Sequence, residues 1–303
     1  MVEKRRFIHL INSGIIMLKS LKDTVCEPSG TQSVIRQALK SPAGLQIAWV
    51  VVEAEEDVAV YEKFMQRDST VVKTSEDNTG HKGYANVEII VQTIKEDEPR
   101  AHIMGIRDAD YSRYEEGYSV PVNIFLTDRR DLEMMLLEAN SVKQALHDWI
   151  QNYDEALSKC VPVCRHFGYL RIYNDVAGLS VKFHDHLRPS KYWNFQQQAV
   201  AIGWEQESTA KFVALSEGGC TTPDVTSFIA THKLEDEELY NVCRGHDLLK
   251  LLSLTLIDVQ TYSVGAIMAK MTAAYSSEDF KATKLYASIQ AWQAAEGVVA
   301  LAA

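Results

Sequence analysis

Acidic residues follow three of the apolar, β-branched segments of this chain. The segments and the residues after them are 46–52 with Glu53, 102–106 with Asp108 and Asp110, and 122–127 with Asp128, Asp131 and Glu133. Carboxylates are the ligands that Mg²⁺ prefers, and one or two of them usually bind it together with water and phosphate oxygens. In an extended D-x-D segment both carboxylates point to the same side and could reach one ion. With a separate Glu as ligand or general acid/base, this pattern predicts metal-dependent phosphoryl-transfer chemistry.

Some of these acidic residues are expected to have a structural role only. Asp and Glu are common at helix N-caps and in first turns, where they offset the helix dipole. We expect Glu55, Glu56 and Asp57 to have that role.

The elements that would position the carboxylates alternate between strand and helix. Strands are predicted at 46–52, 71–74, 102–106 and 122–127, with helices at 57–66 and 85–94 between the first three. This order is typical of right-handed βαβ units and an open, mainly parallel sheet. Catalytic groups of such sheets gather at the carboxyl ends of the strands, where the acidic residues lie.

The chain as a whole divides into three parts on this interpretation. They are an N-terminal helical segment at 1–45, with helices at 5–22 and 31–40, an α/β core at 46–140 and a mainly helical C-terminal region at 141–303. From residue 131 on, helices are predicted at 131–139, 141–158, 194–202, 235–257 and 279–297, with a less regular stretch at 160–192. The expected fold class is therefore α/β.

The charge balance, the cysteines and the length of the apolar runs exclude some classes of protein. The 303 residues carry 31 Lys and Arg against 41 Asp and Glu, for a net charge of −10, which excludes a protein covered in cationic surface for non-specific nucleic-acid binding. The acidity is concentrated in residues 47–140, with ten basic and twenty acidic residues. Five cysteines at irregular spacing predict a reducing cytoplasm rather than a disulfide framework. No apolar run is long enough to predict a membrane span.

Two stretches together resemble the TOPRIM domain, and two more narrow the resemblance. Val51-Val52-Glu53-Ala54 with Asp57 resembles its first motif, usually V-E-G-x-x-D, although Ala54 replaces the usual Gly. Asp108-Ala109-Asp110 resembles its D-x-D motif at the usual separation. The stretch from Thr127 to Glu133, and Arg244-Gly245-His246-Asp247 later on, resemble a bacterial TOPRIM-like family that pairs with ABC-type ATPases. That family includes the effector nuclease of the PARIS anti-phage system and is related to the overcoming-lysogenization-defect (OLD) nucleases.

The resemblance implies roles for the acidic residues. Glu53 would be the general acid/base or a metal ligand, and Asp108 and Asp110 would bind Mg²⁺, or Mn²⁺ in its place. The remaining residues would help to bind a second metal or hold the first ligands in place; they are Asp128, Asp131 and Glu133.

The function implied by the resemblance is a Mg²⁺-dependent endonuclease. It would cleave RNA, with tRNA favoured, or DNA, as the toxic effector of an anti-phage system, under control of a partner ABC-type ATPase. The protein could also form a homodimer. The alternative is a non-catalytic TOPRIM-like module that binds the ATPase as a sensor. Topoisomerase and primase chemistry would need further domains for which the chain is too short.

Basic residues near the acidic ones are candidate substrate contacts. Lys82, in the loop Gly80-His81-Lys82-Gly83, could contact a phosphate, although the loop lacks the pattern of a Walker motif. Arg129 and Arg130 could meet a nucleic-acid backbone. Neither the pair Cys160 and Cys164 nor the pair His184 and His186 has a second pair of ligands at the spacing of a zinc site. We therefore expect buried thiols and surface histidines there.

Overall fold

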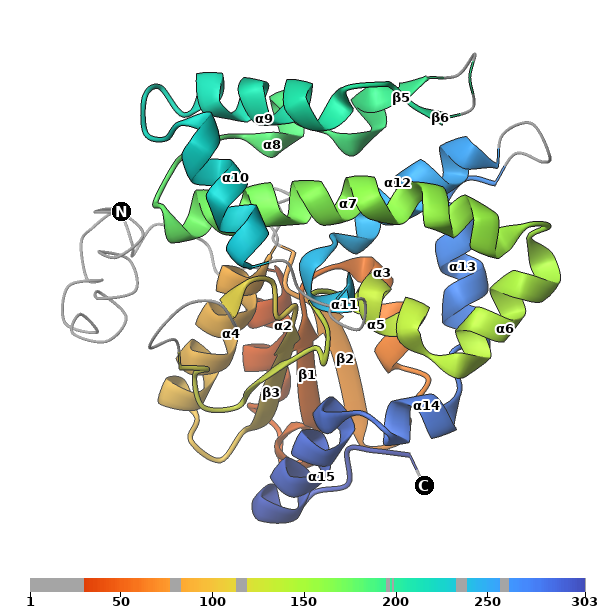
Figure 1. Ribbon diagram of the computed structural model, residues 1–303. Helices are drawn as coiled ribbons and strands as arrows, with labels where there is room; N and C mark the ends of the chain where they lie inside the picture. The colour runs from red at the N-terminus through yellow and green to blue at the C-terminus, as the bar shows by residue number, and fades with distance from the viewer. Residues whose placement is uncertain are drawn as a thin grey trace.

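The computed structural model describes residues 30–76, 83–112, 119–194, 197, 199–232, 239–256 and 262–302. A four-stranded parallel sheet lies at the centre of the α/β part, in the order β2-β1-β3-β4 (Figure 1). The strands are β1 (Ala48–Val52), β2 (Thr70–Thr74), β3 (His102–Arg107) and β4 (Ile124–Leu126). The predicted open parallel sheet is thus confirmed, with each strand within two residues of its expected position at either end.

Helices α2 (Gly30–Ala38) and α4 (Tyr84–Asp97) cover one face of the sheet. Along β1, Trp49 and Val51 point into the core on that face, while Val50 and Val52 point to the opposite side. Every residue of β1 is buried, which is why its sequence is an uninterrupted apolar run rather than an alternating one.

The remaining helices of the described residues extend the hydrophobic core at the other face of the sheet, some packed against its strands and others against neighbouring helices. These are α3 (Glu55–Tyr61), α5 (Leu132–Glu138), α6 (Asn140–Trp149), α7 (Tyr153–Val176), α8 (Phe183–His186), α9 (Trp204–Leu215), α10 (Thr222–Thr231), α11 (Leu239–Val242), α12 (Gly245–Thr255), α13 (Val264–Ala274), α14 (Ser277–Lys281) and α15 (Lys284–Glu296). One hydrophobic core runs from the sheet into these helices: it includes Val50 and Met104 as well as Phe167, Phe212 and Leu248.

Several predictions for the C-terminal region at 141–303, the helical half of the chain, are wrong. The stretch expected to be irregular is largely the 24-residue helix α7, which contains Pro162. Its buried residues form one stripe as far as Phe167, but Gly168, Tyr169 and Ile172 widen the buried face beyond it, and Pro162 is a residue that rarely occurs inside a helix. The helix expected at 194–202 is instead a short antiparallel pair, β5 (Trp193–Asn194) with β6 (Ala199–Val200).

The helix expected at 141–158 is two helices, α6 and α7. The break falls at Asn152, whose positive φ of 59° is a left-handed conformation that a helix cannot continue through. The helix expected at 5–22 lies outside the described residues, and the one at 31–40 is α2. In the described part of the chain, no helix is both long and apolar enough to cross a membrane.

Candidate functional site: a carboxylate cluster at the sheet edge

Glu53 and Asp108 meet at the carboxyl ends of neighbouring strands. Glu53 follows β1 and Asp108 follows β3, and these two strands pair in parallel. The backbone N–H of Asp108 donates to Oε1 of Glu53 at 2.9 Å. The structure therefore brings together the two residues that the strand pattern placed at one edge of the sheet.

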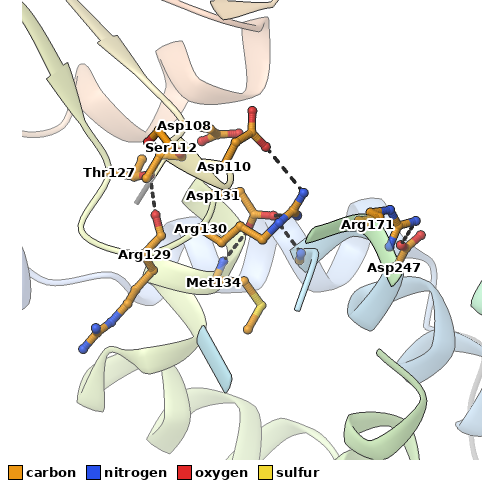
Figure 2. Close-up of polar contacts among 12 residues, drawn as sticks. Asp108, Asp110, Ser112, Thr127, Arg129, Arg130, Asp131, Met134, Arg171 and Asp247 are labelled. Atoms are coloured by element: carbon orange, nitrogen blue, oxygen red, sulfur yellow. Dashed lines mark hydrogen bonds and ion pairs between the residues drawn. The ribbon is translucent and has the colours of Figure 1, made fainter. Parts of the chain in front are cut away.

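Asp110 lies in a different backbone conformation from the one expected. The strand ends at Arg107, and Asp110 has φ of 45°, so the D-x-D segment is not extended and the prediction from strand alternation is wrong. The N–H of Asp110 donates to the carbonyl of Arg130 at 2.7 Å, and this contact holds the turn. Its carboxylate, about half exposed, lies 3.4 Å from the Arg130 guanidinium (Figure 2).

Asp131 and Asp108 both anchor the start of α5. Oδ1 of Asp131 accepts from the Met134 N–H at 3.0 Å, as an N-cap residue does. Oδ1 of Asp108 accepts from the N–H of Leu132 at 3.0 Å, which ties β3 to the same helix end. As a result, Asp131 and Glu133 on α5 lie beside the carboxylates at the strand ends.

Burial and mutual repulsion mark these carboxylates. Burial raises the pKa of Glu53 to about 7, and the charges of Asp110 and Asp57 add to this effect. Burial, with the charges of Asp131 and Glu53, raises the pKa of Asp108 well above its usual range. Burial and Asp131 raise the pKa of Glu133 to about 8. The fold thus brings together carboxyl groups whose ionised forms repel one another, and a bound cation would favour those ionised forms.

Arg130 supplies a buried positive charge next to the cluster. Its side chain is 6% exposed, and its guanidinium lies 3.0 Å from Asp131 and 4.4 Å from the centre of the Tyr111 ring. Sequence reasoning made Arg130 a candidate phosphate contact. The structure instead uses it to hold Asp110 and Asp131.

Two more predicted residues are engaged elsewhere. Both carboxylate oxygens of Asp128 accept backbone N–H groups at the start of α15, from Lys284 at 2.7 Å and Leu285 at 2.8 Å. Arg129 pairs with Glu138 and points away from Asp108 and Asp110 (Figure 2). Lys82 lies outside the described residues.

Two more residues act on the cluster in ways that the sequence pattern did not predict. Asp57 accepts the N–H of Ala54 at 3.0 Å, as expected of a first-turn residue, but its charge also acts on Glu53. Arg107 is buried at the end of β3, donates to the carbonyl of Asp108 at 2.9 Å and lies 2.8 Å from Glu88. An arginine that ends an otherwise apolar strand is the signal that could have identified it.

The buried thiols and the surface histidine are found as expected. Cys160 and Cys164 are buried free thiols, and His184 is exposed. His166 lies 3.0 Å from the Ser208 hydroxyl, and burial lowers its pKa to about 4.

The cluster fits one mode of metal binding and not another. Within the described ranges, no group of three or more His, Cys, Asp or Glu side chains could hold a metal ion, so a cage of protein ligands does not fit. Mg²⁺ commonly binds through one or two carboxylates, with water and substrate oxygens completing its coordination. Glu53 and Asp108 match this mode: each uses one oxygen for a backbone hydrogen bond, and the second accepts none from the described residues. Oε2 of Glu53 faces the start of α4, where a Cβ on Gly83 would lie 3.9 Å away.

Neither a comparison with models of known protein families nor a search of curated proteins finds a match to this chain.

Proposed function

We propose that this protein is a Mg²⁺-dependent phosphodiesterase of the TOPRIM type that cleaves RNA, with tRNA favoured, or DNA. The observation that supports the proposal is the meeting of Glu53, Asp108 and the α5 carboxylates at the carboxyl edge of a parallel sheet. A catalytic site is expected at this edge, and an all-oxygen donor set suits a hard divalent cation and phosphate chemistry.

Glu53 and Asp108 would hold the ion. When bound, Mg²⁺ would polarise the phosphodiester and lower the pKa of a coordinated water. If Asp108 alone holds the ion, Glu53, with a pKa near 7 in the metal-free protein, would instead accept and return a proton at neutral pH. Arg130 would keep Asp110 and Asp131 in place, because a buried guanidinium paired with two carboxylates cannot move without leaving them uncompensated.

In the cell we propose a role as the toxic effector of a bacterial anti-phage system, in the cytoplasm and under control of an ABC-type ATPase. This part rests on the sequence resemblance at Glu53, Asp108 and the stretch 127–133.

The test is cleavage of total tRNA and of plasmid by the purified protein, with Mg²⁺ and with EDTA. We expect Mg²⁺-dependent cleavage that Glu53→Gln reduces at least about a hundredfold, because the substitution removes either a ligand charge or a proton acceptor. Glu56→Gln is the matched control, since Glu56 is an exposed residue on the adjoining helix. Expression of the wild type should also be toxic, and Glu53→Gln or Asp108→Ala should remove the toxicity. Equal growth of all strains and no cleavage of either substrate would contradict the proposal.

A non-catalytic module that binds the ATPase is the second candidate. It is favoured by the backbone hydrogen bonds of Asp108 and Asp131, which on their own give these residues a structural role. For this candidate, Mg²⁺ should leave the melting temperature unchanged, and Asp110→Asn should have no effect on partner binding.

A further inference from the structure

The first residue of α12 touches the carboxylate cluster directly. The buried N–H of Gly245 donates to Oδ2 of Asp131 at 2.8 Å. Asp131 therefore receives one backbone hydrogen bond from its own helix and one from a helix more than a hundred residues later in the chain. Only the second of these depends on how the helical half is placed.

There is no space at this contact for a side chain. A Cβ on Gly245 would lie 2.6 Å from Oδ1 of Asp131 and 2.4 Å from Cβ of Glu133. Both distances are too short for real contacts, so any larger residue would push α12 away from α5. The glycine is needed here for close approach.

An ion pair holds α12 in this position from the other side. Asp247, two residues after Gly245, lies 2.6 Å from the guanidinium of Arg171 on α7 (Figure 2). Both side chains are 11% exposed. The Arg171 guanidinium also lies 4.7 Å from the centre of the Phe183 ring, which restricts its orientation.

We propose that Arg171 and Asp247 are positioning residues for the carboxylate cluster. They hold the start of α12 against α7 at the place where the Gly245 amide reaches Asp131, and so couple the placement of α7 to the geometry of Asp131 and Glu133. The functional consequence rests on the proposed function, because it takes the cluster as the site of a divalent cation.

A partner that displaces α7 would act on the site through this connection. Asp131 and the proposed ligand Asp108 both accept N–H groups at the start of α5, and removal of such outer partners of metal ligands commonly changes metal affinity about 10- to 100-fold. An ATPase bound to the helical half could thus switch the site without touching it.

The test measures Mn²⁺ binding to the purified full-length protein by calorimetry. Arg171→Ala and Gly245→Ala should weaken binding about tenfold or more, and Arg171→Lys should recover part of the loss because it restores the charge opposite Asp247 but not the planar group over the Phe183 ring. Gly265→Ala is the control: Gly265 lies in the first turn of α13, and a Cβ there would meet nothing closer than 4.0 Å. Melting curves of each variant establish that it is folded.

Hydrogen–deuterium exchange of the metal-free protein tests the coupling without a cation. Arg171→Ala should increase exchange in peptides covering residues 131–137 and 245–250, and leave α15 unchanged. Unchanged exchange at 131–137 in a folded Arg171→Ala protein would overturn the inference.

The two failures can be told apart. If the wild type binds no Mn²⁺ and cleaves no nucleic acid, the proposed function fails, and the exchange result alone decides whether Arg171 positions Asp131. If the wild type binds Mn²⁺ and Arg171→Ala binds it equally well, the positioning role fails and the proposed function stands.

Discussion

The fold disfavours the ionised forms of Glu53 and Glu133, and their pKa values lie near neutral pH. Burial raises the pKa of the first to about 7 and of the second to about 8, from an ordinary value of 4.5. In the metal-free protein the ionised forms repel their neighbours with no cation to offset them. Stability and cation binding should therefore be linked at these two side chains.

The metal-free protein should lose stability as the pH rises. Above the ordinary pKa of 4.5, the folded state holds protons on Glu53 and Glu133 that the unfolded chain releases, so unfolding releases protons. The melting temperature in EDTA should thus fall between about pH 4.5 and about pH 8, by several degrees on the scale of roughly 2–4 °C per kcal/mol for a chain of this order of size.

Scanning calorimetry across this pH range measures the effect. Glu53→Gln should flatten the curve, because its amide does not titrate, while Glu56→Gln should follow the wild type. Added Mg²⁺ should raise the melting temperature more at the higher pH, where the carboxylates are ionised. A melting temperature that rises with pH would contradict the assignment.

At the scale of elements, helix ends do much of the positioning in this site. Asp131 caps α5, Asp108 accepts from the first turn of the same helix, and the N–H of Gly245 opens α12. Asp128 does the same for α15, although it follows β4 just as Asp108 follows β3. Two residues with equivalent places in the sequence pattern therefore have different partners.

Replacing Asp128 distinguishes a helix-capping role of its carboxylate from a metal-binding one. Asp128→Ala should destabilise the protein by about 1–2 kcal/mol, because two N–H groups at the start of α15 lose their acceptor. It should leave Mn²⁺ affinity within about twofold, since the carboxylate is committed to α15. Thr283→Ala, which removes the N-cap hydroxyl of the same helix, provides the comparison for stability. Loss of Mn²⁺ binding in Asp128→Ala would make Asp128 a ligand, as the sequence resemblance implied.

The elements near the sheet could be predicted because their signals are local. The run from Ala48 to Val52 is apolar throughout, and its burial on both faces requires that pattern. Helix α7 could not be predicted in the same way, because helices pack around it and Pro162 interrupts its sequence. The pair β5–β6 is too short to carry a periodic signal.

The candidate site could be predicted to the level of strand ends but not beyond. The positions of Glu53 and Asp108 followed from the parallel sheet alone. The left-handed turn at Asp110 and the burial of Arg130 depend on contacts between distant segments, which spacing does not encode. The contact of Gly245 with Asp131 is of the same kind.

At the scale of the whole molecule, the C-terminal segment returns to the sheet region. The N–H of Gln66 donates to the carbonyl of Ala300, and the N–H of Ala302 donates to that of Phe64, each at 2.8 Å. Ala300 and Leu301 are buried in the core that the sheet shares with the helices. The two halves of the chain are thus joined at this point as well as at Gly245.

Removing residues 298–303 should therefore weaken the whole protein. Two backbone hydrogen bonds worth about 1 kcal/mol each and a buried Leu worth about 2 kcal/mol would be lost, so we expect the melting temperature to fall by about 10 °C. Val299→Ala, at a position 59% exposed, should change it little. A deletion variant that melts with the wild type would show that this segment does not support the sheet.

The contact between Gly245 and Asp131 also sets when the cluster can be completed during synthesis. A ribosome adding about 5–20 residues per second reaches Gly245 on the order of ten seconds after Asp131, and the Arg171–Asp247 pair closes only after that. A nascent chain that already contains Glu53, Asp108 and Asp131 thus still lacks the amide that one oxygen of Asp131 accepts. Completion of the cluster therefore depends on synthesis of the helical half as well as of the sheet.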